Sequence, residues 1–300
     1  MRRPWIKPGA RRRVRTRSAL LLSAGVCLAM AWYRLLATLN SMGWLWNTHL
    51  PGLTVELAVT ALVFGGASVL GLRVLDGDQC KILPRAALSR AQVLWCSLLG
   101  ALAVAPMTLA ADVLRSLTAG GSAAGAGFAV RAPGVFILAL IKSALLVPVL
   151  EELFFRGYLL HALERFGSGR AAWVSALCFA LAHTGGAAHA WLLYTALGLL
   201  LAKITLKTGS LLAPVLVHGC YNLALIVLDY SGLGGLFAGL SLGSCALRLG
   251  LCLAFVYALR RALTARGAHA QVKPIGRLSR RDWALVAAAA ALTLVAALLA

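Results

Sequence analysis

Apolar stretches long enough to cross a lipid bilayer recur along the whole of this 300-residue chain. A transmembrane α-helix needs about 20 consecutive, mostly apolar residues, and 61% of this sequence is hydrophobic whereas only 13% is charged. The sequence therefore predicts an all-α, polytopic transmembrane helix bundle with about eight or nine spans, and it excludes a soluble globule. The expected spans lie near residues 19–39, 53–75, 93–114, 133–155, 171–188, 190–206, 211–228, 233–259 and 283–299.

Most of the net charge of +20 lies in short Lys/Arg clusters between these spans. Clusters of this kind favour the cytoplasmic side of a membrane and attract anionic lipid headgroups. With a cytoplasmic N-terminus, nine crossings place each dense cluster on the cytoplasmic face. We therefore expect an integral protein of the bacterial inner membrane that contacts membrane lipids and binds no nucleic acid. The clusters are 2–17, 81–90, 156–170, 203–207 and 260–281.

The basic segment and the first apolar stretch together resemble a signal peptide, and Ala29-Met30-Ala31 offers a possible cleavage site. The apolar stretch is longer than an ordinary signal-peptide core, so a retained first helix is favoured and a cleaved signal is the alternative. We divide the chain into a basic cytoplasmic segment at 1–18, N-terminal transmembrane helices at 19–130, a central membrane core at 131–230 and C-terminal helices with a basic loop at 231–300.

Polar and ionisable residues gather within the apolar helices of the central core. Such residues are costly in a bilayer unless they are paired or hydrated, and they usually have a function. The candidate site residues are Glu151, Glu152, Arg156, His183, His218 and Asn222.

The two carboxylates differ in their expected surroundings. Glu152 and Arg156 are four positions apart, so they lie on one helix face and can form an ion pair. That pair could either orient the helix or act in catalysis. Glu151 lies off this face and lacks such a partner, which suits a general base.

The histidines have both functional and structural interpretations. His183 stands alone in an apolar helix, where a histidine is often a packed core residue. His218 and Asn222 lie one turn apart and could present two hydrogen-bond donors to a developing oxyanion. The same two side chains could instead hold neighbouring helices together.

Three ordered motifs resemble the CPBP family of intramembrane proteases, also called the CAAX prenyl protease 2 or Abi family. The motif EExxxR occurs at Glu151–Arg156, FxxxH at Phe179–His183 and HxxxN at His218–Asn222. The flanking sequences FFRGYLL and GSLLAPVLVH agree as well. The resemblance covers roughly residues 135–230, and the remaining spans rest on hydropathy.

The resemblance implies peptide-bond hydrolysis within the membrane. By analogy, Glu151 activates a water molecule with help from His183, while His218 and Asn222 stabilise the tetrahedral oxyanion. The expected partner is a membrane-associated protein or peptide substrate, and no cofactor is expected. Eukaryotic members remove the last three residues of prenylated CAAX proteins, whereas many bacterial relatives act on other substrates.

The same analogy gives Glu152 and Arg156 a role in holding the site together. Some eukaryotic members carry an asparagine one turn after the first histidine, and this chain has Ala187 at that position. The Ala- and Arg-rich composition is typical of bacteria, which makes a prenylated substrate less expected.

Three other functions remain as alternatives. Glu151, His183 and His218 could bind a catalytic zinc ion, because two histidines and a glutamate form an ordinary zinc site. A membrane scaffold or immunity protein would keep the fold without needing Glu151. A transporter is the least favoured, since the polar residues form one cluster and no path.

Overall fold

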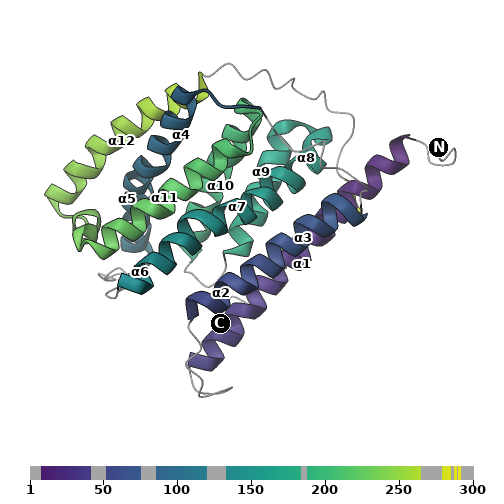
Figure 1. The fold of residues 1–300 in the computed structure, drawn as a ribbon, viewed down its shortest axis with the longest axis horizontal. Coiled ribbons are helices and arrows are strands. Elements are labelled where there is room, and N and C mark those ends of the chain that lie inside the picture. The colour runs from purple at the N-terminus through teal and green to yellow at the C-terminus, as the bar shows by residue number, and fades with distance from the viewer. Residues whose placement is uncertain are drawn as a thin grey trace.

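The computed structural model describes residues 8–41, 52–75, 86–119, 133–183, 188–264 and 279–284, together with 287, 288, 290 and 291. These residues form helices and no β-strand (Figure 1). The predicted all-α membrane bundle is confirmed. Six helices within the described ranges are long and apolar enough to cross a membrane, namely Arg17–Ala37, Val55–Arg73, Arg90–Leu117, Ala190–Thr208, Leu212–Tyr230 and Leu242–Leu263.

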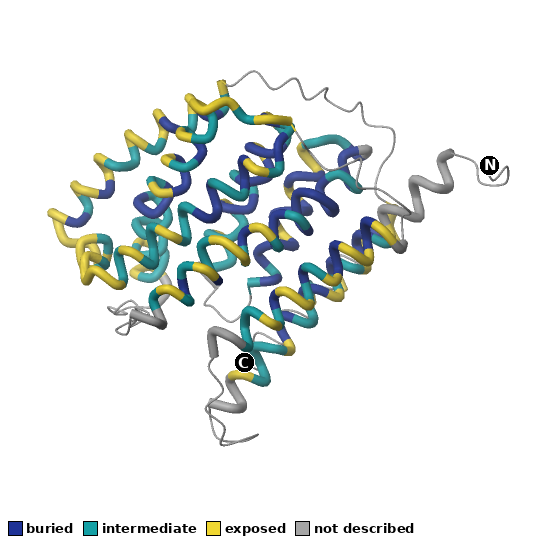
Figure 2. Tube along the Cα trace, viewed as in Figure 1, coloured by how far each residue is buried: buried dark blue, intermediate teal, exposed yellow. Residues whose placement is uncertain are grey.

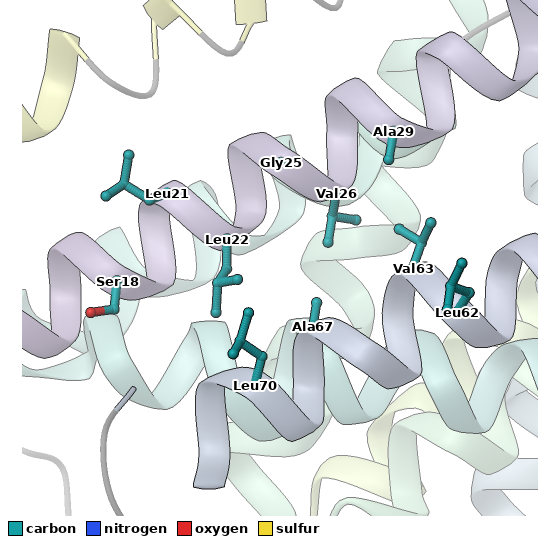
Figure 3. A pocket seen from close by; sticks show the side chains of 10 residues that line it. All are labelled: Ser18, Leu21, Leu22, Gly25, Val26, Ala29, Leu62, Val63, Ala67 and Leu70. Carbon is teal, nitrogen blue, oxygen red and sulfur yellow. The ribbon is translucent and has the colours of Figure 1, made fainter. Parts of the chain in front are cut away.

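Helix α1 (Pro8–Ser41) lies along one side of the molecule, next to a second helical run (Figure 1). That run consists of α2 (Gly52–Thr60), the π-helix η1 (Ala61–Gly65), α3 (Gly66–Val69) and the π-helix η2 (Leu70–Leu75). An apolar pocket of about 490 Å³ lies between α1 and this run (Figure 3). None of the predicted site residues lines the pocket.

One long helical run carries the predicted carboxylates. It begins with α6 (Pro133–Ala139), the π-helix η4 (Leu140–Leu146) and α7 (Val147–Glu152), and it continues through the π-helix η5 (Leu153–Leu159) and α8 (Leu160–Leu163). Single-turn π segments are frequent at functional sites. Here two of them border the Glu151-Glu152 pair.

The remaining helices pack around this run. A short 3₁₀ turn, η6 (Glu164–Phe166), leads into α9 (Ser168–Ala182), which packs along α10 (Ala188–Thr208). Helix α11 (Leu212–Tyr230) packs against both η4 and α4 (Arg90–Leu102). Figure 2 shows the buried residues concentrated along the central helices, and α9 alone buries nine of its 15 residues.

Glycine permits close helix contacts around the predicted site. A Cβ atom on Gly198 of α10 would lie 2.9 Å from the Cα atom of Ala176 in α9. A Cβ atom on Gly219 of α11 would lie 2.6 Å from the carbonyl oxygen of Ala144 in η4. Small residues at such positions allow membrane helices to approach closely, so these two glycines fix the distances between the site-bearing helices.

The expected span at 233–259 begins later than the hydropathy indicates. Gly232 and Gly239 have φ angles of 74° and 73°, which interrupt the helix. Between them lies the 3₁₀ helix η7 (Leu233–Phe237), and α12 (Leu242–Leu263) then begins at the N-cap residue Ser241. Apolar composition alone therefore overestimated the length of this helix at its N-terminal end.

Helix α12 is held to α5 (Val104–Ala119) by a buried arginine. Arg248 of α12 has no exposed surface, and its Nη1 atom donates to Asp112 Oδ2 of α5 at 2.7 Å and to the carbonyl of Phe237 at 3.2 Å. The ion pair thus joins α12, α5 and η7. The expected span near 283–299 lies mostly outside the described residues.

Candidate active site

The structure brings five of the six predicted residues into one connected cluster. Glu151 and Glu152 end α7, Arg156 follows in η5, His183 caps the C-terminus of α9, and His218 lies in α11. The sixth residue, Asn222, lies one turn after His218 and contacts η4 instead. His183 was expected inside a helix, but its backbone has φ −99° and ψ 37°, so it lies where α9 ends.

Glu152 is the centre of a buried hydrogen-bond network. Its Oε1 atom accepts from Arg156 Nη1 at 2.9 Å and lies 3.0 Å from Nδ1 of His218. The carboxylate and the guanidinium are both completely buried. Arg156 Nη2 also donates to the carbonyl of Gly198 at 3.0 Å, and its guanidinium lies 4.5 Å from the ring centroid of Phe179. The predicted pairing of Glu152 with Arg156 is present, and with the bonds to His218 and Gly198 it joins the long helical run to α11 and α10.

Glu151 faces a different partner. Its Oε2 atom lies 3.5 Å from Nε2 of His183. Nδ1 of His183 lies 2.7 Å from the carbonyl oxygen of Phe179. Because a carbonyl can only accept, Nδ1 carries the proton, and in the neutral ring Nε2 is then an acceptor. Among the described residues Glu151 Oε2 has no hydrogen-bond partner, so two acceptor atoms face each other.

His218 and Asn222 do not share one partner. His218 uses Nδ1 toward Glu152, which leaves its Nε2 atom available. Asn222 Nδ2 donates to the carbonyl of Ser143 in η4 at 2.7 Å. The close approach of α11 at Gly219 brings the asparagine within reach of that carbonyl. Since an amide nitrogen carries two protons, one N–H of Asn222 remains for another acceptor.

Aromatic rings orient both histidines, and one of them, Tyr194, was not predicted from the sequence. The ring of Tyr194 in α10 stacks on His183, with 4.5 Å between centroids and an interplanar angle of 29°. Phe179 contacts His218 edge-on, with centroids 5.7 Å apart and an angle of 76°. Phe179 is the first residue of the FxxxH motif, whereas nothing in the apolar sequence around Tyr194 separates it from an ordinary packing residue.

In the part of the chain that the structure describes, no group of three or more His, Cys, Asp or Glu side chains is arranged to hold a metal ion. Nδ1 of His183 bonds to a backbone carbonyl, and Nδ1 of His218 bonds to Glu152. Only the two Nε2 atoms would be available as histidine ligands.

All these motif residues lie in one stretch of the chain that is similar to a known family. Residues 133–224 match the family described as type II CAAX prenyl endopeptidase, Rce1-like. The predicted resemblance is confirmed for this segment. The Rce1-like match implies a CAAX-type intramembrane protease, a peptide hydrolase that acts on a membrane-associated protein. No match to this chain is found among curated proteins.

Proposed function

We propose that this chain is a glutamate-dependent intramembrane endopeptidase that cleaves a membrane-associated protein or peptide. The observation that carries the proposal is the opposed pair of acceptors, Glu151 Oε2 and His183 Nε2, 3.5 Å apart. A water molecule that donates one hydrogen bond to each atom would satisfy both and would keep a lone pair for attack.

The reaction follows from these groups. Glu151 takes a proton from the water molecule while the water oxygen bonds to the carbonyl carbon of the substrate. The resulting oxyanion accepts hydrogen bonds from the remaining N–H of Asn222 and from Nε2 of His218 in its protonated form. Glu152 stabilises that imidazolium through Nδ1. The proton on Glu151 then passes to the leaving nitrogen, and the C–N bond breaks.

The contacts favour glutamate chemistry over zinc chemistry. A zinc protease would use Glu151 as a ligand and would need a second glutamate as the base. Glu152 is a poor base, because Arg156 and His218 both contact its Oε1 atom. We therefore propose a metal-independent enzyme, with no bound cofactor.

The first test replaces the proposed base. Glu151→Gln keeps the size of the side chain but cannot take a proton, so cleavage should fall by about 10³-fold or more while the protein still accumulates. Proteomics of membrane peptides should find fragments that depend on wild-type protein and vanish in the variant. Glu164→Gln in η6 is the control: it changes a buried carboxylate whose described ion pair is with His161 and with none of the six site residues, so these fragments should be retained.

Two outcomes would contradict this function. If Glu151→Gln preserves every fragment and phenotype at a normal protein level, the chain is a scaffold and not this enzyme. If dialysis against a strong chelator abolishes the activity of the purified protein and added zinc restores it, the metalloprotease is the correct function.

A further inference from the structure

The π-helix η5 determines how Arg156 lies relative to the two carboxylates, because it follows Glu152 directly and contains the arginine. A π-helix bonds a carbonyl to the N–H five residues later, whereas an α-helix uses the N–H four residues later. The N–H of Leu160 donates to the Phe155 carbonyl with the five-residue spacing. The helix α8 then restores the four-residue spacing. A change from five to four skips one carbonyl, and at this junction it is the carbonyl of Arg156.

Two side chains donate hydrogen bonds to the carbonyls at this junction. Nδ1 of His161 lies 2.7 Å from the carbonyl oxygen of Arg156, and Nδ1 carries the proton because a carbonyl can only accept. Ser175 of α9 donates through its Oγ atom to the Phe155 carbonyl at 3.0 Å. The His161 side chain is only 8% exposed, and Ser175 is completely buried. Since buried backbone carbonyls need hydrogen-bond partners, these two side chains stabilise the π form of η5.

The reach of the His161 side chain matches the spacing of the π-helix. Nδ1 of His183 bonds to the carbonyl of Phe179, four positions earlier, whereas Nδ1 of His161 bonds to a carbonyl five positions earlier. Nε2 of His161 lies 3.7 Å from Glu164 Oε2. The ring therefore connects the backbone of η5 to η6, although His161 belongs to none of the three sequence motifs.

A series of contacts leads from His161 to the proposed oxyanion site. His161 holds the carbonyl of Arg156, and Nη1 of the same arginine donates to Glu152 Oε1 at 2.9 Å. That oxygen atom also lies 3.0 Å from Nδ1 of His218. A shift of the Arg156 backbone would therefore move Glu152, and with it the histidine whose Nε2 atom is proposed to stabilise the oxyanion.

We propose that His161 is a positioning residue of the active site, which acts through the Arg156 backbone to hold His218 in place. Ser175 assists through the Phe155 carbonyl. This inference rests on the proposed peptidase function and adds a residue from outside the motifs. The effect is expected on the reaction step and not on substrate binding, because an oxyanion donor acts mainly in the transition state.

The test compares two substitutions of His161 on the peptide whose cleavage depends on Glu151. His161→Phe keeps a flat ring and removes the donor, so kcat should fall about 10- to 100-fold with KM unchanged. His161→Asn places an amide N–H where Nδ1 lies, so it should restore most of kcat. The control is Glu164→Gln, which changes the group facing Nε2 and keeps the Nδ1 bond, so its kcat should stay at the wild-type value.

Two outcomes of this comparison would overturn the proposal. If His161→Asn is as slow as His161→Phe, the ring only fills space and its hydrogen bond has no role. If Glu164→Gln is as slow as His161→Phe, the contact at Nε2 is the important one and the bond to the Arg156 carbonyl is not.

A double variant tests whether His161 acts through Arg156. The combination of His161→Phe with Arg156→Lys should be about as slow as Arg156→Lys alone, because residues that act through one contact have non-additive effects. Reductions that multiply would show that His161 acts independently, and the proposal would fail. Ser175→Ala should lower kcat less than His161→Phe does, since the Leu160 N–H still donates to the Phe155 carbonyl.

Hydrogen exchange distinguishes failure of the positioning role from failure of the peptidase, because it needs no cleavage. Amides of residues 153–163 should exchange about 5- to 10-fold faster in His161→Phe than in the wild type, and His161→Asn should slow them again. If the wild type cleaves no peptide but exchange follows this order, the positioning role stands and the peptidase function fails. Equal exchange in all three proteins while cleavage is intact overturns the positioning role alone.

Discussion

At the scale of single residues, the Glu152 carboxylate determines how the site is held together. It is completely buried, and one of its oxygen atoms contacts both Arg156 and His218. A buried ion pair contributes little to stability relative to apolar packing, but the loss of one partner leaves an uncompensated charge. Removing one partner of this pair is therefore expected to cost more stability than the intact pair contributes.

Arg156→Ala should consequently reduce folded protein more than it changes the chemistry of the remaining fraction. Removing one partner of a buried pair costs about 3–5 kcal/mol, and the variant also loses the bond to the Gly198 carbonyl. Thermal unfolding in detergent should show a clearly lowered midpoint. Arg156→Lys keeps the charge but not the planar guanidinium, so its unfolding midpoint should lie between those of the wild type and Arg156→Ala.

The control for this prediction is Arg170→Ala, since Arg170 is exposed and, among the described residues, bonds only to the Phe166 carbonyl. Its unfolding midpoint should stay close to that of the wild type. A normal midpoint for Arg156→Ala combined with lost cleavage would show that the arginine acts in catalysis and not in holding the site.

Sequence spacing predicted the local contact of this cluster and not the distant ones. The pairing of Glu152 with Arg156 follows from four positions on one helix. The contacts of Glu152 with His218 and of Asn222 with Ser143 join residues 66 and 79 positions apart. They depend on how α11 packs against the long helical run, which hydropathy and motif spacing do not specify.

At the scale of the elements, the distance between α9 and α10 is set by a missing side chain. The carbonyl of Gly198 accepts a hydrogen bond from Arg156, and Ala176 packs closely against the side of Gly198 that lacks a side chain. Gly198→Ala should push α10 away, weaken the contact to Arg156, and lower both the unfolding midpoint and the rate of cleavage. The measurement is thermal unfolding together with cleavage of the Glu151-dependent peptide.

Gly250→Ala in α12 is the matched control for this substitution. A Cβ atom there meets nothing within 4 Å, so the variant should be unchanged or stabilised by up to about 1 kcal/mol through helix propensity. Equal behaviour of the two alanine variants would mean that the close approach at Gly198 is unimportant.

The elements also show where sequence-based boundaries failed. The spans at 93–114, 190–206 and 211–228 correspond to described helices with similar limits. The prediction for 233–259 was wrong at its beginning, because Gly232, Gly239 and the capping Ser241 act through backbone geometry that hydropathy does not register.

At the scale of the whole molecule, charge distribution gives a topology that labelling can check. Single cysteines in a background without the native ones should react from the cytoplasmic side at positions 81, 165 and 266, and from the opposite side at positions 47 and 120. The physical reason is the retention of Lys/Arg clusters in the cytoplasm. The readout is modification by a membrane-impermeant maleimide in intact and opened cells.

Position 165 is decisive among these, because it follows the helical run that carries the candidate site. Its labelling from outside would reverse the orientation of the core. A cytoplasmic C-terminus would remove only the expected last span and leave the site assignment unaffected.

The Glu152 network also has a consequence for biogenesis. A polytopic chain enters the bilayer helix by helix as it is synthesised. Glu152 and Arg156 belong to one helical run, so their charges can neutralise each other while that run is being inserted. Gly198 and His218 leave the ribosome 42 and 66 residues after their respective partners in this network. The nascent chain therefore carries a self-compensated ion pair into the membrane first, and the site is completed only when α10 and α11 arrive.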